Sequence, residues 1–232
     1  MKLTYLGHSS VLIDTGEFTL IIDPFLTGNP VASAKADEIK ADYVLLTHGH
    51  FDHIGDAEAI ARANGATIIG IVELADFFKN KGLTTAGLNL GGSFVFPFGK
   101  LTLTPALHSS SVEIDGTNVY LGVAAGILLD LGGFVLYHAG DTALFSDLKL
   151  IGDRRQIDLA FLPIGDYFTM GPEDALLAAE WLHPKHVVPI HYNTFGLVAQ
   201  DGAKFVDQLK HKNIIGHVLK PGESLDTSSL DQ

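Results

Sequence analysis

Short apolar runs recur along the chain, and Gly, Pro, Asn or Asp bounds most of them. Three of these runs follow one another near the N-terminus, over Lys2–Leu6, Val11–Asp14 and Phe18–Ile22. Apolar runs of this length between turn residues are typical of buried β-strands. The same pattern predicts further strands over Tyr43–Leu46, Ala66–Ile71, Ser93–Phe98, Lys100–Pro105, Val119–Asp130, Gly133–Tyr137, Asp158–Pro163, Val187–Ile190 and Ile214–Leu219.

Stretches with helical patterning alternate with these runs. They predict helices over Asp56–Asn64, Glu73–Lys81, Pro172–Leu182 and Asp201–Lys212. A glycine just after the first of them and a proline in the first turn of the third are ordinary helix boundary signals. The Gly- and Thr-rich residues 83–91 are expected to form a loop, and Asp226–Gln232 a frayed tail. Strands that alternate with helices predict the α/β fold class.

Four apolar runs share one feature, which is that each finishes in a polar, chemically capable residue. These runs are Asp42–His48, Phe134–Asp141, Asp158–Asp166 and Lys185–His191. Open α/β architectures place their ligands outside the carboxyl ends of the strands. We therefore expect the scattered His and Asp residues to meet in one cleft.

The segment Thr47–Asp56 carries the densest chemistry, because His48, His50, Asp52 and His53 lie within six residues. Imidazole together with carboxylate suits zinc, iron, manganese or nickel better than the oxygen-only preference of magnesium or calcium. Glycines interrupt the segment, which predicts a tight loop. A loop can fold four ligands around one centre, whereas a straight strand would point alternate side chains to opposite faces.

This His-x-His-x-Asp-His segment resembles the signature of the metallo-β-lactamase superfamily, and the resemblance extends over nearly the whole chain. Within the superfamily it is most similar to the ascorbate-6-phosphate lactonase-like branch. The resemblance implies a four-layer αββα sandwich formed by residues 1–232 as a single hydrolase domain. A chain of 232 residues fits one such domain.

The resemblance also implies a centre of two divalent metal ions, with zinc expected first and manganese, iron or nickel as alternatives. The implied ligands are His48, His50 and His108 for one ion, Asp52, His53 and His191 for the other, and Asp141 as the bridge. Two such ions lie about 3.5–4 Å apart and can share a water whose pKa falls to about 7. The expected reaction is attack by this metal-bridging hydroxide on a carbonyl or phosphoryl centre.

Four further roles stay open on the sequence. His8 is either an ordinary turn residue or a hydrogen-bonding, substrate-facing group at the mouth of the metal site. Asp23 supports the histidine loop in the resembling family, and it also suits a turn before proline. For His138 a supporting or packing role is favoured over metal binding. Asp52 is a candidate base as well as a ligand. His183 and His186, which flank Pro184 and Lys185, are expected to be solvated.

Composition narrows the class of protein. The chain has no Cys, which excludes disulfides, thiolate ligands and a cysteine nucleophile. The first residues lack the pattern of a signal peptide, and no uninterrupted apolar run is long enough to span a membrane. These features predict a soluble cytoplasmic protein, and they leave its oligomeric state open.

The net charge of −12 makes nucleic acid an unlikely partner, because an acidic surface repels a phosphate backbone. The ligand set that the resemblance implies, together with this acidic chain, makes a metal-dependent hydrolase for a small polar ester, lactone or amide the expected function. The alternatives are a phosphodiesterase or nuclease of the same superfamily, a di-iron redox enzyme and a non-catalytic metal-binding protein. The loops expected to line the pocket are Phe25–Pro30, Ser109–Ser111, Tyr167–Gly171 and Tyr192–Phe195.

Overall fold

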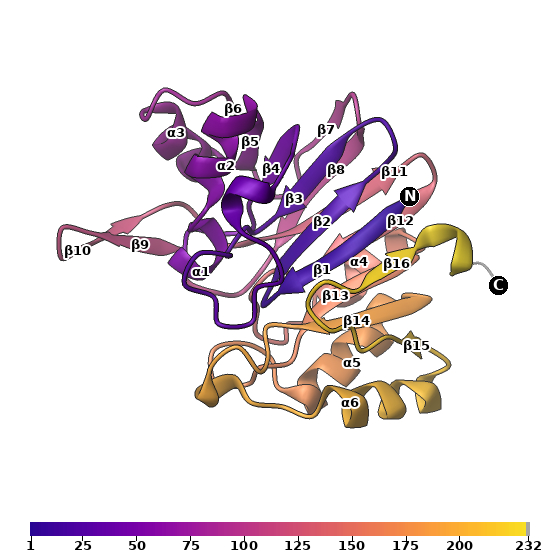
Figure 1. The fold of residues 1–232 in the computed structure, drawn as a ribbon. Helices are drawn as coiled ribbons and strands as arrows, with labels where there is room; N and C mark the ends of the chain where they lie inside the picture. Colours follow the sequence, from indigo (N-terminus) through magenta and orange to yellow (C-terminus); the bar gives the residue numbers. More distant parts are fainter. Residues whose placement is uncertain (231–232) are drawn as a thin grey trace.

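The computed structural model describes residues 1–230, and two seven-stranded sheets form its centre (Figure 1). Helices cover the outer faces of both sheets. The order of the first sheet is β16-β1-β2-β3-β4-β5-β6, and that of the second is β15-β14-β13-β12-β11-β8-β7. The expected αββα sandwich is confirmed by this layering.

Each sheet is antiparallel on one side and parallel on the other. In the first sheet the pairs among β1, β2 and β3 are antiparallel, and those from β3 to β6 are parallel. Its strands are β1 (Lys2–Gly7), β2 (Ser10–Asp14), β3 (Thr19–Ile22), β4 (Tyr43–Leu45), β5 (Thr67–Ile71), β6 (Thr85–Leu88) and β16 (Ser224–Asp226).

The second sheet runs parallel from β12 to β15. Its strands are β7 (Ser93–Phe96), β8 (Gly99–Pro105), β11 (Ala125–Leu131), β12 (Phe134–His138), β13 (Leu159–Pro163), β14 (His186–Ile190) and β15 (Ile215–Gly216). A separate hairpin of β9 (Ser111–Ile114) and β10 (Thr117–Tyr120) projects away from the body of the protein (Figure 1).

Two groups of helices form the outer layers. The helices α2 (Ala57–Asn64) and α3 (Val72–Lys79) pack on the first sheet, and α5 (Pro172–Leu182) and α6 (Gly202–Leu209) pack on the second. The helix α4 (Leu148–Arg154) packs against α5, and the single turn α1 (Phe51–Ile54) follows β4. Short 3-10 turns complete the described chain at η1 (Ala36–Glu38), η2 (Gly196–Val198), η3 (Lys210–Lys212) and η4 (Thr227–Ser229). No helix among residues 1–230 is both long enough and apolar enough to cross a membrane.

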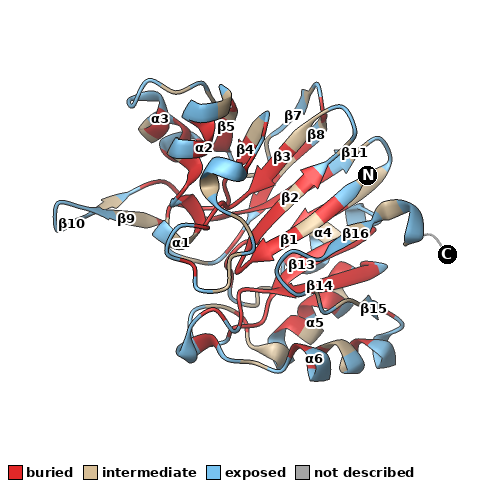
Figure 2. Ribbon diagram, viewed as in Figure 1, coloured by how far each residue is buried: buried red, intermediate tan, exposed pale blue. Residues whose placement is uncertain are grey.

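The apolar core joins the layers. Ile13 and Leu45 of the first sheet belong to the same buried cluster as Leu129 and Phe161 of the second. A second cluster lies between the second sheet and its helices. Buried residues accordingly concentrate along the strands in Figure 2. Complete burial of each large aliphatic or aromatic side chain contributes about 1.5–3 kcal/mol, so packing between the layers stabilises the sandwich without disulfides.

Several sequence expectations were wrong in detail. Residues 83–91 are not all loop, since they contain β6. The stretch Val119–Asp130 is not one strand, because its first residues belong to the projecting hairpin and β11 begins only at Ala125. Only Ile215–Gly216 of the expected final strand forms β-structure. The helix α4 was not predicted from the sequence.

The C-terminal end is also more ordered than expected. Asp226 pairs with Lys2 where β16 joins β1, and η4 follows, while residues 231–232 lie outside the described chain. His183 is exposed as expected, but His186 is buried. The ring of His186 contacts His217 and the Leu230 carbonyl at 3.0 Å each, so the end of the described chain covers it.

Candidate metal centre

The histidine loop begins where β4 ends. His50 is the first residue before α1, and its carbonyl accepts hydrogen bonds from the His53 and Ile54 amides at 3.0 Å. This single turn of helix carries Asp52 and His53 toward the second sheet. Position 49 requires glycine for a steric reason, because a Cβ there would lie only 2.8 Å from the Leu121 side chain.

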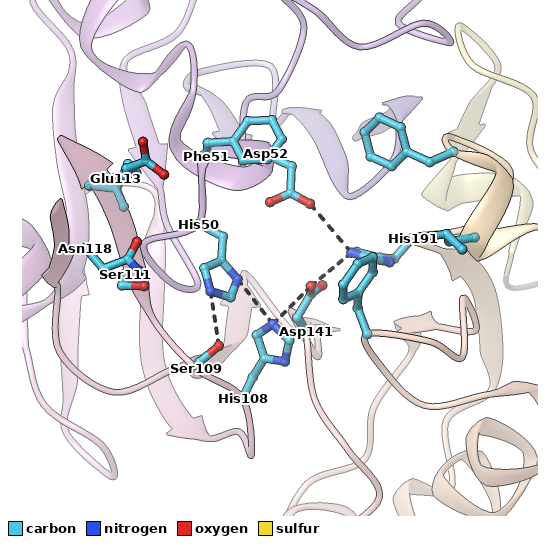
Figure 3. A pocket seen from close by; sticks show the side chains of 14 residues that line it. His50, Phe51, Asp52, His108, Ser109, Ser111, Glu113, Asn118, Asp141 and His191 are labelled. Atoms are coloured by element: carbon cyan, nitrogen blue, oxygen red, sulfur yellow. Dashed lines mark hydrogen bonds and ion pairs between the residues drawn. The ribbon is translucent and has the colours of Figure 1, made fainter. Parts of the chain in front are cut away.

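The second sheet supplies three further side chains from the ends of its strands. His108 follows β8, Asp141 follows β12 and His191 follows β14. The structure brings all of them to the histidine loop. Asp141 lies at the middle of the group, and its Oδ2 is 2.9 Å from His191 Nε2 (Figure 3). The same oxygen is 3.3 Å from His53 Nε2.

Six of the seven side chains form two groups, and the seventh, Asp141, lies between them. The nitrogens of His48, His50 and His108 approach to within 4.8 Å of one another, and so do ligand atoms of Asp52, His53 and His191, which His8 joins. Asp141 Oδ2 is 3.6 Å from His108 Nε2 in the first group as well as close to both histidines of the second. This division is the one that the family resemblance implies. That the residues bind metal stays a prediction.

Buried atoms without partners provide an independent test of the fit. Within the described residues, His53 Nε2 and Asp141 Oδ1 are buried and make no hydrogen bond. Such atoms each cost about 1–3 kcal/mol unless a partner satisfies them. An imidazole nitrogen beside a carboxylate oxygen is a suitable donor set for a first-row divalent cation. The residues present therefore fit the implied metal.

The protonation states agree with this fit. Burial lowers the pKa of His48, His50 and His108, which keeps these imidazoles neutral, as metal ligands must be. Burial opposes the ionisation of Asp141, but the neighbouring His191 and His53 rings hold its pKa well below the usual range. Asp141 is therefore a carboxylate at neutral pH.

His53 differs from the other histidines. Burial lowers its pKa, but Asp141 and Asp23 together outweigh this effect and raise the pKa well above the usual value. His53 Nδ1 lies 2.7 Å from Asp23 Oδ2, on the side opposite Asp141. Two carboxylates beside one imidazole favour positive charge at this position, which a divalent cation satisfies as well as a proton does.

Asp23 holds the histidine loop with three hydrogen bonds. Besides His53 Nδ1, its carboxylate accepts from the Thr47 amide at 2.9 Å and from the Thr47 hydroxyl at 2.6 Å. Its backbone is left-handed, with a φ of 46°. Asp23 lies directly after β3, whose neighbour β4 leads into the loop. These contacts fit both expected roles, turn and support, and the support of a metal ligand stays a prediction.

His8 is not an ordinary exposed turn residue. It lies on the tight turn between β1 and β2 with a φ of 56°, and its side chain is fully buried. Its Nε2 is 3.1 Å from Asp52 Oδ2 and its Nδ1 is 2.8 Å from Thr194 Oγ1. A carboxylate only accepts, so Nε2 carries the proton and Nδ1 accepts from the Thr194 hydroxyl. Burial lowers the pKa of His8 to about 4, so the ring is neutral.

The His8 carbonyl connects the two sheets as well. It accepts hydrogen bonds from the His191 amide at 2.8 Å and the Tyr5 hydroxyl at 3.0 Å. Thr194, the second partner of the His8 ring, was expected only as part of the pocket-lining loop Tyr192–Phe195 and had no role of its own assigned on the sequence. The one available signal was its place in the polar stretch that follows His191.

His138 supports a neighbouring turn. Its Nε2 lies 3.0 Å from the Ser9 carbonyl, and its Nδ1 accepts from the Gly140 amide at 3.1 Å. Both ring nitrogens are thus engaged away from the two ligand groups. These contacts favour the supporting role, since Gly140 directly precedes Asp141.

A cavity of about 770 Å³ opens beside the centre. Its lining consists of His50, Phe51, Asp52, His108, Ser109, Ser111, Val112, Glu113, Asn118, Asp141, Phe168, His191, Phe195 and Leu197. Three of the four expected loops contribute. The loop Phe25–Pro30 does not reach the lining, and the β9–β10 hairpin, which the sequence did not reveal, takes part instead.

Comparison with known proteins places the chain among metal-dependent hydrolases. Residues 9–192 match the model of the β-lactamase superfamily domain. A UPF0173 metal-dependent hydrolase of Anoxybacillus flavithermus is 54% identical over 227 residues, which are 97% of this chain and 100% of that protein.

Solved structures agree on the fold. Igni18, a metallo hydrolase of the archaeon Ignicoccus hospitalis, is 38% identical with a TM-score of 0.88, and the match covers 97% of both chains. The di-iron β-hydroxylase CmlA of Streptomyces venezuelae shares the fold at 15% identity and a TM-score of 0.75, where 97% of this chain matches 53% of that one. The lactonase-like branch stays an expectation. The chain belongs to the metallo-β-lactamase superfamily, within its UPF0173 metal-dependent hydrolases.

Proposed function

We propose that residues 1–232 act as one binuclear hydrolase domain that cleaves a small ester, lactone or amide, with zinc as the first candidate metal. The observation that carries this proposal is the meeting of seven His and Asp side chains, with Asp141 at their middle, beside an open cavity. Divalent cations at such a centre polarise a substrate carbonyl and lower the pKa of water to about 7.

The protein's own residues divide the work. His48, His50 and His108 would hold one cation, and the second group would hold the other, with Asp141 shared between them. Asp52 also lines the cavity, so its carboxylate can accept a proton from an attacking water there. A hydrogen bond from His8 fixes that carboxylate, and Thr194 in turn fixes the His8 ring.

Of the alternatives, the phosphodiesterase is the second candidate, because metal sites of this kind also stabilise phosphoryl transfer. Against it, no Lys or Arg is among the described residues that line the cavity, and the net charge is −12. The family resemblance disfavours a di-iron redox enzyme, because it implies Glu in that class at the position of His50. A purely structural metal protein does not need the adjoining cavity. The lack of Cys suits a reducing compartment, and we propose the cytoplasm.

The test combines metal analysis with a substrate panel. Purified protein is analysed for bound metal and then assayed with ester, lactone, amide and phosphodiester substrates, including bis-p-nitrophenyl phosphate and single-stranded RNA. We expect two equivalents of metal and turnover of a carboxylic ester, lactone or amide that His48→Ala abolishes. Metal-loaded protein that turns over only phosphodiesters, or nothing in the panel, would remove the support for this function.

A further inference from the structure

The cavity beside the metal centre has an apolar side whose members are unusually exposed. They are Phe51, Phe168, Phe195 and Leu197, exposed by 61%, 51%, 36% and 62%. Scattered exposed apolar residues are normal, but a group that rims one cavity marks a binding surface. The four side chains come from α1, from the loop after β13, and from the end of the loop after β14 with η2.

A buried ring holds part of this surface in place. Phe25 is 2% exposed, and its ring centroid lies 5.6 Å from that of Phe51 and 6.3 Å from that of Phe195. The His8 ring also meets Phe195 edge-on at 5.7 Å. Rings fixed by such packing lose little conformational freedom when a ligand binds, which favours affinity for an apolar or aromatic group.

The opposite side of the cavity is polar and acidic. Glu113 and Asn118 are direct partners across the β9–β10 hairpin, so their side chains share one face with Ser111. Figure 3 shows these three side chains together on one side of His50, with Asp141 and His191 on the other side. Among the described residues Glu113 has no ion-pair partner, and neither Lys nor Arg lines the cavity.

From these two sides we infer the substrate class, an inference that rests on the proposed hydrolase function. The substrate is a small amphiphilic molecule whose apolar, aromatic part packs against Phe51, Phe168 and Phe195 and whose cationic group lies beside Glu113. An anionic substituent, such as the phosphate of a phosphorylated sugar, would find a carboxylate instead of a basic partner on the hairpin.

Binding of cations that cannot coordinate a metal tests this inference without any turnover. Calorimetry on metal-loaded protein compares benzyltrimethylammonium with tetramethylammonium, which lacks the ring. We expect Glu113→Gln to weaken the binding of both cations about threefold to fivefold, as for exposed charge pairs. Phe168→Ala should weaken only the benzyl compound, by about threefold to tenfold. Glu17→Gln and Phe94→Ala are the matched controls, since both residues are exposed and lie outside the cavity.

A turnover experiment separates this inference from the proposed function. The p-nitrophenyl esters of 4-(trimethylammonio)butanoate and its uncharged isostere 5,5-dimethylhexanoate differ only in charge. We expect a higher kcat/KM for the cationic ester and loss of that preference in Glu113→Gln. Ester turnover without a cation preference would overturn the substrate class and leave the hydrolase function standing. Cation binding that depends on Glu113, without turnover of any panel substrate, would support the cation site and overturn the hydrolase function. If wild type binds benzyltrimethylammonium no more tightly than Glu113→Gln does, the substrate class is wrong.

Discussion

Replacement of Asp23 by Asn should weaken metal binding without direct contact to the metal. The Asp23 Oδ2 atom accepts two hydrogen bonds, from the Thr47 hydroxyl and from His53 Nδ1, and Oδ1 accepts one hydrogen bond from the Thr47 amide. An Asn side chain has one acceptor oxygen and one amino group, so it loses one or two of these bonds in either orientation. Asn also tolerates the left-handed backbone of this position, so the variant changes the side chain alone.

The magnitude follows from the charge and burial of these bonds. Hydrogen bonds to a charged group contribute about 1.5–3 kcal/mol each, so the loss of one or two of them in Asp23→Asn should cost roughly 1.5–6 kcal/mol of unfolding free energy. Supporting residues of metal ligands typically change metal affinity about 10-fold to 100-fold when replaced. We expect a loss of metal affinity in that range, because His53 loses the partner that orients its ring.

Asp56→Asn is the matched control. Asp56 is also a buried carboxylate with three hydrogen bonds, from the Leu26 amide and from the amide and hydroxyl of Thr27, and it makes none to a histidine. Its replacement should cost similar stability and leave metal affinity unchanged. Denaturant unfolding after chelator treatment measures the first quantity, and competition with a chromogenic chelator measures the second. Equal metal affinities in the two variants would refute the orienting role of Asp23.

Three further expectations concern single side chains. His108→Ala should lower the bound metal by about one equivalent in elemental analysis. The exposed control His183→Ala should retain the metal content of the wild type. Full metal occupancy in both variants would argue against His108 as a ligand. Thr194→Val should lower kcat by roughly tenfold with a smaller change in KM, because the His8 ring loses the partner that fixes its tautomer. The control Thr194→Ser keeps the hydroxyl and should retain most activity. Identical kinetics in the two variants would contradict the positioning role of Thr194. Burial, and then its histidine neighbour, lower the pKa of His217, so below about pH 6.5 the unfolded chain binds a proton that the folded chain resists. The unfolding free energy should therefore fall as the pH drops through 6.5, and His217→Asn should make that fall shallower; parallel curves for the two proteins would exclude this contribution.

Much of the site was predictable because its information is local. The His-x-His-x-Asp-His spacing shows four candidate ligands within one loop, and strand ends such as Phe134–Asp141 show where distant carboxylates emerge. Parallel strands have their carboxyl ends at one edge of the sheet, so the approach of Asp141 to His191 follows from topology. The seven predicted positions are indeed together in the structure.

The parts that the sequence did not reveal depend on tertiary contacts. The strand β6 lies in the Gly- and Thr-rich residues 83–91, and it forms because β5 offers parallel pairing at the sheet edge. The hairpin is split from β11 by Leu121–Ala124, where Gly122 takes a φ of +86° beside Ile71 and Glu73, and a single glycine in an apolar run does not reveal such a break on its own. Thr194 gains its importance from a ring that lies 186 positions earlier in the chain. No periodicity or spacing carries such information.

The ligand residues come from both sheets, which has a consequence for the order of folding and metal binding. The loop after β4 carries His48 to His53, while His108, Asp141 and His191 reach the same point only after the second sheet has docked. A nascent or half-assembled chain can therefore offer a cation no more than the partial donor set of one loop. Binding of metal by all seven side chains would therefore mark the docking of the two sheets as complete. The bound metal would then stabilise the docked sheets against separation.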